Sequence, residues 1–476
     1  MYSIIIFGTG SSAEAIVSQL NNNKASIIAF IDNNIEKQGM LIHGIPVHAP
    51  QSLKDNDFSY DYIIIASQFV SFIYNQLLEL GVDSRKIIPI YSELHTSQIK
   101  EYIDNILNDM TYNDNHEIKR ISMVSINPSG CNSRALYHLA PGYIKDKYEL
   151  VLREKGSLDN VEDDAVITTH RNVALKGNKI NIEMWHGFPL KGMGRMNRNV
   201  NQEDTGSSEN WSSAHLISSY SDIYTTLMNA CFPTNVTQYT VTGMPRNDYL
   251  YRSKGKDGIV KIFGDVIKDR TIVYYLPTFR KKTTYSTRNF EEGNRIWNNT
   301  FGFEQFDEVK FTNFLERHNI LLVCKQHAFE EAVYSHVISD YMRNHVLQLT
   351  NQALEEQNLD LYEVLNACDV LITDYSSVYF DYLLLDRPII FTPLDIEDYR
   401  KTRGFLLEPY DFWTPGEHAM SQEGLEKSLL LALSDPKAHA KQREVVRNII
   451  HTYRDGCSTE RVWRCIDELI SNYRTR

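Results

Sequence analysis

The chain has 476 residues, of which 42% are hydrophobic, 11% aromatic and 23% charged, so we expect an ordinary folded protein of roughly two to four domains. Its formal net charge of −12 excludes a general nucleic-acid binder, because such proteins need many uncompensated Lys and Arg side chains. No uninterrupted apolar stretch reaches the about 18 residues of a membrane-spanning helix. The six cysteines lack CxxC spacing, which favours reduced, mostly buried thiols and predicts no metal site.

The first segment predicts a small doubly wound unit over residues 1–92. A β-rich run, a glycine turn and a helical pattern (YSIIIFGTGSSAEAIVSQL) are followed by three more strand patterns. The turn fits GxGxxG/A and an acid ends the next strand, so Gly8, Gly10 and Asp32 are candidates for a nucleotide site. Tight packing of strand on helix explains the same glycines, and both explanations stay open. The N-terminus lacks a basic lead, so no signal peptide is expected.

The rest of the chain is organised as a linker, two α/β stretches and a helical end. Residues 93–118 are polar and Asn-rich, which is typical of a linker. Strand and helix patterns alternate over 119–250 and again over 251–420, which predicts two Rossmann-like halves. Residues 421–476 are expected to form closing helices. This order is expected of a two-domain transferase with its cleft between the halves.

The run EMWHGFPLKGMGRM, residues 183–196, places a histidine where a strand of the first stretch ends. His186 can take a proton near neutral pH there, at the sheet edge where doubly wound folds bind ligands. Lys191, Arg195 and Arg198 follow as a basic cluster. A solvated loop, a contact with acceptor phosphates and a contact with anionic lipid headgroups all stay open for this cluster.

A second candidate site follows the strand in DVLITDYSSVYFDYLLL. The strand is expected to end at Thr373 and Asp374, and Ser376 and Ser377 are expected to open an amphipathic helix. Free N–H groups and the positive end of the helix dipole suit a phosphate there, although plain helix capping explains the same residues. His327 ends another strand of this half, ILLVCKQH.

Six motifs together resemble the CDP-glycerol glycerophosphotransferase family, which makes teichoic acids and related capsule polymers. In chain order over about residues 120 to 470 they are WHGFPLK, GMPRND, YLPTFR, DVLITDYSSVYFDYLLLDRPIIF, RGFLLEP and DGCSTERV. The resemblance implies an α/β fold with a GT-B-like pair of Rossmann-like domains, preceded here by the small N-terminal one. That N-terminal unit resembles the nucleotide-sugar-binding domains of sialic-acid-type sugar O-acyltransferases, through IFGTGSSAEAI, FIDNN and GIPV.

The resemblance implies transfer of glycerol phosphate from CDP-glycerol to a hydroxyl of a lipid-linked acceptor, with release of CMP. It implies a cytoplasmic protein, peripheral on the inner face of the cell membrane, with no required cofactor; a need for Mg²⁺ and a homo-oligomer stay open. Ribitol phosphate transfer from CDP-ribitol and a non-catalytic nucleotide-sensing scaffold are the alternatives. A nicotinamide-dependent oxidoreductase fits poorly, because the N-terminal unit has no Tyr-x-x-x-Lys pair.

The resemblance also implies roles for individual residues. His186 matches the family's motif histidine and is the expected general base, and His327 matches a second histidine, expected on the donor phosphates or as the acid for leaving CMP. Ala328 departs from the proline that many relatives carry there. Arg246 stays open between a phosphate contact and an ion pair with Asp248. The candidates for substrate binding are Gly187, Lys191, Arg195, Arg246, Thr278, Arg280, Asp374, Ser376 and Ser377.

Overall fold

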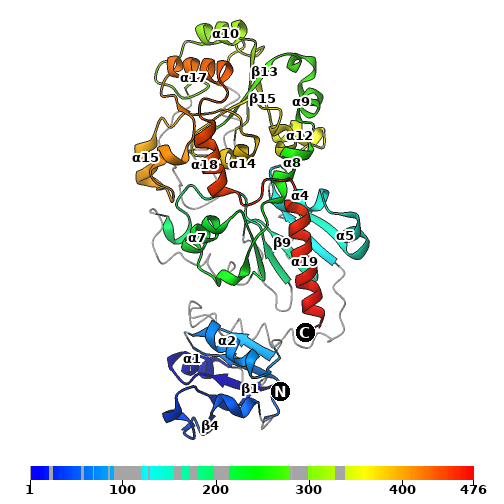
Figure 1. Cartoon of the computed structure of the whole chain (residues 1–476), viewed down its shortest axis with the longest axis vertical. Helices are drawn as coiled ribbons and strands as arrows, with labels where there is room; N and C mark the ends of the chain where they lie inside the picture. Colours follow the sequence, from blue (N-terminus) through cyan, green and yellow to red (C-terminus); the bar gives the residue numbers. More distant parts are fainter. Residues whose placement is uncertain are drawn as a thin grey trace. The chain divides into compact units, whose positions relative to one another are not determined.

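The chain forms two compact units. In this computed structural model the described residues are 2–20, 25–54, 58–67, 69–83, 86–90, 120–126, 129–154, 163–170, 180–197, 214–278, 280, 298–326 and 338–475. One unit holds a sheet from the N-terminal part of the chain, and the other holds the two later sheets (Figure 1). The segment predicted as a linker, 93–118, lies outside the described residues.

The N-terminal unit contains a six-stranded sheet of order β3-β4-β2-β1-β5-β6, parallel except for the β3–β4 pair. Its strands are β1 (Tyr2–Phe7), β2 (Ala25–Ile31), β3 (Leu41–Ile42), β4 (Ile45–His48), β5 (Tyr62–Ile65) and β6 (Ile87–Pro89), and its described α-helices are α1 (Ser11–Gln19) and α2 (Val70–Glu79). Successive apolar residues of β1 pack into two different core clusters. A strand buried on both faces explains why the sequence shows an unbroken apolar run there.

The first half of the second unit is a parallel sheet of order β12-β11-β10-β9-β7-β8. Its strands are β7 (Arg120–Ser125), β8 (Glu149–Glu154), β9 (Ala165–Thr168), β10 (Ile180–Glu183), β11 (Leu216–Ser219) and β12 (Tyr239–Val241). Its helices include α4 (Asn132–His138), α5 (Gly142–Lys147) and α7 (Asp222–Cys231). Figure 1 shows α7 on one side of this sheet and α5 on the other. The sheet is therefore doubly wound, as predicted.

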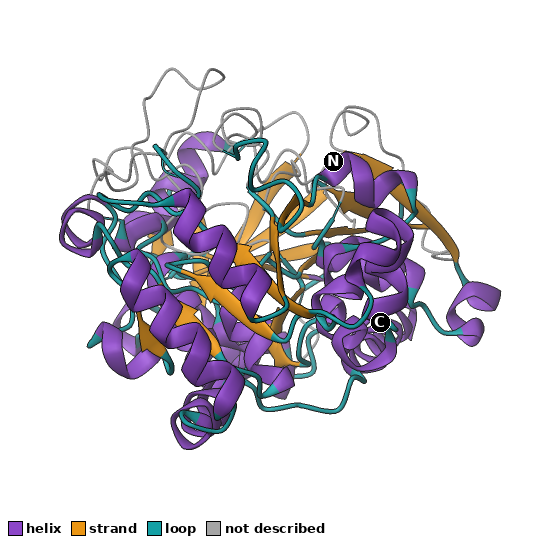
Figure 2. Cartoon of the chain, turned by 90° about the horizontal axis from the view of Figure 1, so that it is seen from above, coloured by secondary structure: helices purple, strands orange, loops and turns teal. Residues whose placement is uncertain are grey.

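The second half is also a parallel sheet, of order β15-β14-β13-β16-β17-β18. Its strands are β13 (Thr271–Leu276), β14 (Ile320–Cys324), β15 (Val346–Gln348), β16 (Val370–Thr373), β17 (Ile389–Phe391) and β18 (Glu417–His418). Its helices include α8 (Asp248–Arg252), α9 (Gly255–Phe263), α10 (Glu308–Arg317), α12 (Asn351–Glu356), α13 (Leu361–Leu365), α14 (Val378–Tyr382), α15 (Ile396–Thr402) and α16 (Tyr410–Trp413). From above, strands run through the interior with helices around them (Figure 2).

The helices predicted over 421–476 are confirmed as α17 (Gln422–Ser434), α18 (Ala440–Ile450) and α19 (Ser458–Thr475). Helix α17 packs against the second-half sheet, whereas α19 returns to the first half. There the indole of Trp463 donates a 3.1 Å hydrogen bond to the carbonyl of Leu136. The buried Asp248 carboxylate accepts from the first two N–H groups of α19, at 2.8 and 2.7 Å. The end of the chain therefore ties the two halves together.

One hydrophobic core continues from the first half into the second. The ring of Phe188, from the loop after β10, lies 4.8 Å from that of Phe380 on α14. Tyr220, which follows β11, lies 5.6 Å from the same Phe188 ring. The two halves thus pack directly against each other, and their loops meet at the carboxyl ends of the strands.

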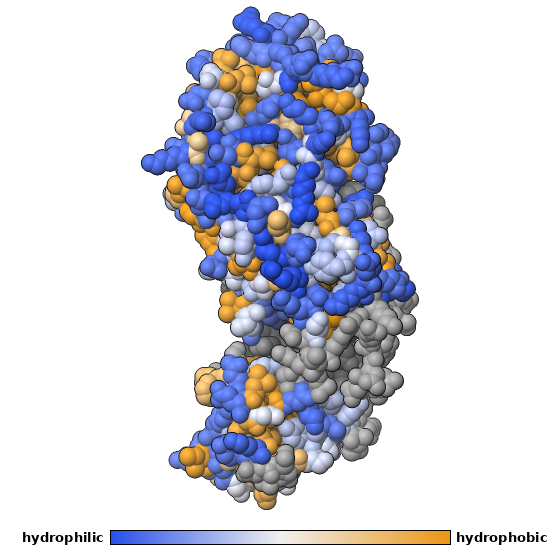
Figure 3. Space-filling view, turned by 45° about the vertical axis from the view of Figure 1, so that its right-hand side comes forward, coloured by the Kyte–Doolittle hydropathy of each residue, from blue (hydrophilic) through white to orange (hydrophobic). Residues whose placement is uncertain are grey.

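The composition of the chain also led to expectations about membrane-spanning helices and about the cysteines. None of the helices in the described ranges combines the length and apolarity needed to span a bilayer. On the face shown in Figure 3, hydrophilic residues predominate and hydrophobic ones occur in small separate areas. The cysteines are free, and four of the six are buried, as predicted: Cys131, Cys231, Cys324 and Cys368.

Candidate functional site

The turn that carries the candidate base begins where β10 ends. Trp185 has a φ of +51°, a left-handed conformation that bulky side chains rarely adopt and that costs about 1–3 kcal/mol. The buried carboxylate of Glu183 holds this turn by accepting from the Trp185 N–H at 2.8 Å and from the Thr168 hydroxyl at 2.5 Å. The strained turn, held by hydrogen bonds to the buried Glu183 carboxylate, places His186 just beyond the carboxyl end of β10.

The imidazole of His186 is oriented by its neighbours. Its Nδ1 lies 3.0 Å from the carbonyl oxygen of Thr169. Since a carbonyl oxygen only accepts, Nδ1 carries the proton and Nε2 keeps its lone pair. The ring stacks on that of His170, with centroids 4.0 Å apart and planes 12° apart. Burial, followed by the nearby His170, lowers the pKa of His186 well below its ordinary value, so the ring is neutral near pH 7.

Gly187 is the point at which this turn contacts the second half. A side chain at Gly187 would place its Cβ 2.5 Å from the Ser377 Oγ and 3.1 Å from the Ser377 Cβ. The backbone there has a φ of +157°, which further favours glycine. The structure therefore brings His186, Gly187 and Ser377 together, although Ser377 is nearly two hundred residues later in the chain.

The helix after Ser377 differs from the prediction. An amphipathic helix was expected, but α14 has five residues, all buried, and a 3-10 turn follows it. Phe380 packs on Phe188 of the first half, and the ring of Tyr379 lies 5.1 Å from that of Phe391 in the sheet of the second half. Because α14 lies between the sheet and the other half, it has no solvent-facing side, and the prediction of an amphipathic helix is wrong.

The candidates at the end of β16 form a paired cluster. Asp374 Oδ1 accepts from the N–H groups of Thr278 (2.8 Å) and Tyr375 (2.6 Å), and its Oδ2 accepts from Arg280 (2.8 Å). Arg280 also donates to both oxygens of Asp395, at 2.7 and 2.9 Å, and is 1% exposed. The charge of Arg280 is therefore turned into the protein between two carboxylates, and a direct contact of Arg280 with phosphate stays a prediction.

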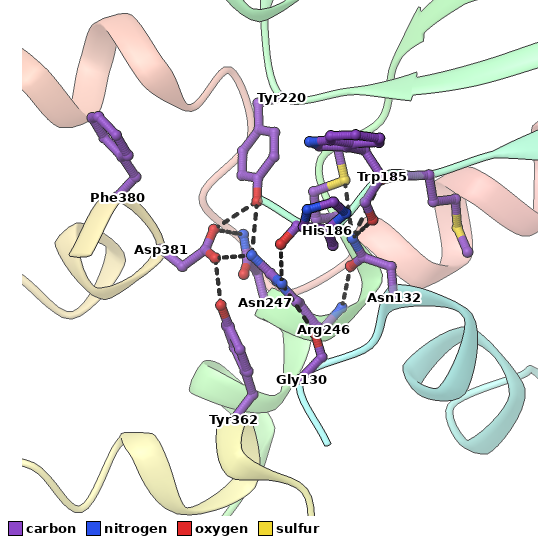
Figure 4. A network of polar contacts seen from close by, with 12 residues as sticks. Gly130, Asn132, Trp185, His186, Tyr220, Arg246, Asn247, Tyr362, Phe380 and Asp381 are labelled. Atoms are coloured by element: carbon purple, nitrogen blue, oxygen red, sulfur yellow. Dashed lines mark hydrogen bonds and ion pairs between the residues drawn. The ribbon is translucent and has the colours of Figure 1, made fainter. Parts of the chain in front are cut away.

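Arg246 is likewise buried, at 4% exposure, and its ion pair is not the expected one. Its guanidinium donates to Asp381 at 2.6 Å (Figure 4). Asp248 instead caps α19. The other terminal nitrogen donates to the carbonyls of His186 (2.7 Å) and Gly130 (3.0 Å). The expected ion pair with Asp248 is therefore wrong, because a carboxylate 135 residues away neutralises Arg246, which also holds the turn of the candidate base; its phosphate contact stays a prediction.

The two described members of the basic cluster after His186 differ in burial. Lys191 is half-buried and forms a β-bridge with Phe405 of the second half, whereas Arg195 is exposed. The substrate contacts of Lys191 and Arg195 stay predictions. His327 and Arg198 lie outside the described residues.

In the N-terminal unit, Gly8 has a φ of +111°, and a Cβ there would lie 2.5 Å from a backbone oxygen just after β5. Close packing therefore accounts for this glycine. Gly10 is exposed before α1. Asp32 accepts from the Thr9 hydroxyl and lies 3.7 Å from the Lys37 ammonium. The nucleotide site of Gly8, Gly10 and Asp32 stays a prediction.

Sequence reasoning missed two residues of the site. Asp381 lies within the apolar run SSVYFDYLLL, where a lone carboxylate is itself a signal of a buried charge partner. Asn132, the first residue of α4, donates to the Trp185 carbonyl at 2.9 Å and accepts from the Arg246 N–H at 3.2 Å. The sequence around Asn132 gave no reason to single it out, because Asn is common at helix starts.

The sequence matches the family profile described as CDP-Glycerol:Poly(glycerophosphate) glycerophosphotransferase over residues 147–468, more than half of the chain. The chain belongs to this family. A second profile, described as C2185-like, N-terminal, matches residues 1–88.

Curated relatives of this glycerophosphotransferase family act in teichoic acid synthesis. The teichoic acid ribitol-phosphate polymerase TarK of Staphylococcus aureus (strain NCTC 8325 / PS 47) is 28% identical over 225 residues, 46% of this chain and 39% of TarK. The teichoic acid glycerol-phosphate primase of Bacillus subtilis (strain 168) is 28% identical over 230 residues, 48% of this chain and 51% of the primase. The chain thus spans about half the length of such relatives, or less.

The solved structure of the wall teichoic acid polymerase TagF has the same fold. It superposes with a TM-score of 0.60 at 19% sequence identity, covering 80% of this chain and 99% of the TagF chain. The predicted α/β class, with a GT-B-like pair of domains and an additional N-terminal sheet, is confirmed.

Proposed function

We propose that this member of the glycerophosphotransferase family transfers glycerol phosphate from CDP-glycerol to a hydroxyl of a lipid-linked acceptor and releases CMP. Family membership supports the general chemistry of a CDP-polyol donor. The names of the relatives support a polyol phosphate as the transferred group, and one TagF variant structure was soaked with CDPG.

The observation that carries the proposal is the contact of Gly187 with Ser377. Gly187 lies in the turn after β10, here called the His186 turn, and Ser377 lies in the turn after β16, here called the Ser377 turn. Each turn follows a strand of a different parallel sheet, and ligands of such sheets bind beyond the carboxyl ends of the strands. A neutral imidazole on one side and a turn that opens a helix on the other suit an uncharged hydroxyl and a diphosphate, respectively.

In the proposed reaction His186 Nε2 takes the proton of the acceptor hydroxyl. The acceptor oxygen then forms a bond to the phosphorus that carries the glycerol, and the bond from that phosphorus to the bridging oxygen breaks. The bridging oxygen leaves with CMP, so the diphosphate is exchanged for a phosphodiester. Such a displacement depends mainly on in-line placement and on stabilisation of the phosphoryl charge.

The donor side of the proposal uses the ends of β13, β14 and β16. Ser376 and Ser377 would hold the diphosphate, and Asp374 would shape the turn. The Thr278 Oγ and both amide atoms of Gln326 are buried without a hydrogen-bond partner in the part of the chain the structure describes. Buried unsatisfied groups at this edge support a ligand that completes them. His327, next to Gln326, keeps its proposed role on the donor phosphates or as the acid for CMP.

The polyol and the membrane contact belong to the same proposal. Ribitol phosphate from CDP-ribitol is a second candidate donor chemistry, supported by relatives such as TarK that are named for ribitol phosphate. A lipid-linked acceptor would bring the protein to the inner face of the cell membrane, and the exposed Arg195 suits anionic headgroups there.

A donor panel tests the proposal. CDP-glycerol, CDP-ribitol and a UDP-sugar are each incubated with the protein and a lipid-linked acceptor, and CMP or UDP release is measured. We expect CMP from one CDP-polyol, no UDP, and loss of CMP release of at least about 100-fold in His186→Gln. His318→Gln, on another surface of the second half, is the matched control and should keep full turnover. Absence of CMP with both polyols would favour the nucleotide-sensing scaffold.

A further inference from the structure

Asp381 connects the two halves at a single buried carboxylate. It is 0% exposed and lies on α14, four residues after Ser377. From the first half it accepts from Arg246 (2.6 Å), Tyr220 (2.9 Å) and Asn247 (2.9 Å). From the second half it accepts from the hydroxyl of Tyr362 at 2.6 Å. Both carboxylate oxygens are therefore used by fixed donors (Figure 4).

The guanidinium of Arg246 carries this connection to the base. One terminal nitrogen donates to Asp381, and the other donates at 2.7 Å to the backbone carbonyl of His186. The guanidinium also lies 4.6 Å from the ring centre of Tyr362. Burial opposes ionisation of Asp381, but Arg246 lowers the pKa of the carboxyl below its ordinary value, so the ion pair is intact at neutral pH. A planar guanidinium fixed on one edge has little freedom to move on the other.

We propose that Asp381 is a positioning residue for the general base: through Arg246 it fixes the His186 turn relative to the Ser377 turn. Helix α14 carries both contacts, because Ser377 touches Gly187 at its start and Asp381 holds Arg246 one turn later. The position of the His186 imidazole therefore depends on how the second half, which would bind the donor, packs against the first half. The expected effect on CMP release rests on the proposed function, whereas the contacts from Asp381 through Arg246 to the His186 turn do not.

A graded pair of variants measures the kinetic consequence. Asp381→Asn keeps the shape of the side chain and removes the charge, and we expect kcat for CMP release to fall about 100-fold with the donor KM unchanged. Tyr362→Phe removes one hydrogen bond to the carboxylate, and we expect a fall of about 10-fold. The control is Tyr382→Phe on the same helix, whose buried hydroxyl donates at 3.1 Å to Cys368 within the second half. It should keep kcat within about 2-fold of the wild type.

A second readout follows the imidazole itself. The charged and titratable groups that act on His186 are His170, Arg246 and Lys191. Its pKa is measured by NMR in protein labelled at histidine, with the signal identified by its loss in His186→Gln. Asp381→Asn leaves the positive charge of Arg246 uncompensated, so the pKa of His186 should fall further. Arg246→Gln removes that charge, so the pKa should rise.

Opposite shifts in the two variants, with a loss confined to kcat, support the positioning role. Unchanged titration in both variants, or kcat of Tyr362→Phe equal to that of Tyr382→Phe, would overturn it. Should Asp381→Asn fail to fold, the comparison of Tyr362→Phe with Tyr382→Phe carries the test. Failure of the wild type to release CMP from any donor would remove the proposed function, whereas the titration would still decide whether Asp381 acts on His186.

Discussion

His186 is held with its proton on Nδ1 and with a depressed pKa, and this determines how pH should act on the reaction. A base works only in its neutral form, and burial together with His170 keeps His186 neutral to a pH below the ordinary histidine range. We expect kcat/KM for CMP release to stay level as the pH falls through 6.5, the ordinary value, and to decline only at more acidic pH. A decline centred at or above 6.5 would contradict the assignment.

The stacked neighbour provides a control for this pH dependence. The charge of His170 is the second largest cause, after burial, of the lowered pKa of His186, and His170→Gln removes it. The acidic limb of the pH profile should therefore move upward in this variant, towards the ordinary histidine range, while the plateau stays within a few-fold of the wild type. A limb that does not move would show that the titrating group is not His186.

Gly187 allows a steric test of the contact between the halves. Gly187→Ala would force a Cβ within 2.5 Å of the Ser377 Oγ, so the two turns must separate. We expect kcat to fall by about 100-fold, the cost of a misplacement of about 1 Å at a reacting centre. Gly142→Ala on α5 is the matched control, since no atom from outside its own helix and adjoining residues lies within 4 Å of its Cβ position. Equal kcat values for the two variants would contradict direct contact of the turns at the site.

Single residues were predictable from sequence where a strand end and an unusual side chain coincide. His186 was singled out in this way, because a titratable ring follows an apolar strand. Its partner Arg246 was also singled out, but the sequence offered the nearby Asp248 as its counter-ion. The true partner, Asp381, is 135 residues from Arg246 along the chain, and only packing of the halves brings the two together.

At the scale of elements, the parallel strands were the easiest to predict. Strands such as β1 and β16 are buried on both faces over much of their length, so their sequences contain apolar runs without polar alternation. Helix α14 was misjudged because apolar residues at helical spacing suggest one buried face, whereas here the whole helix is enclosed. The number of neighbours around a helix is a tertiary property and leaves no distinct period in the sequence.

The start of α19 makes a prediction about stability. Asp248 accepts from two N–H groups in the first turn of this helix and is 0% exposed. We expect Asp248→Ala to lower the free energy of unfolding by about 2 kcal/mol, the upper range for loss of a helix cap. Urea denaturation measures this, with Asp257→Ala at the exposed first turn of α9 as the control. Similar midpoints for the two variants would show that the cap does not hold α19.

At the scale of the second unit, Asp360 joins the halves with a pH-dependent contact. Its carboxylate accepts from the Gly130 N–H at 2.7 Å, across the halves, and from the Tyr362 N–H at 2.8 Å. Burial raises the pKa of Asp360 and the two hydrogen bonds lower it; burial has the larger effect, so the pKa rises from 3.8 to about 6. Because the carboxyl of Asp360 binds its proton more tightly in the folded protein than in the unfolded chain, it adds to the free energy of unfolding. This contribution is fully present below the pKa of the unfolded chain and is lost as pH rises through the pKa of the folded protein.

The comparison of wild type with Asp360→Asn isolates this contribution. As pH rises from about 4 to about 7, we expect the unfolding free energy of the wild type to decrease relative to the variant by roughly 2.5 kcal/mol. Tryptophan fluorescence follows the second unit, because all five tryptophans lie between residues 185 and 463. Parallel pH dependences of the two proteins would contradict the raised pKa.

In the proposed reaction the His186 turn and the Ser377 turn face one diphosphate. A crystal structure of His186→Gln with CDP-glycerol tests it most directly, because this variant should bind the donor without consuming it. We expect the diphosphate beside Ser377 and Thr278, with the glycerol-bearing phosphorus towards the side chain at position 186. Donor bound in the N-terminal unit, or on a surface remote from both turns, would contradict it.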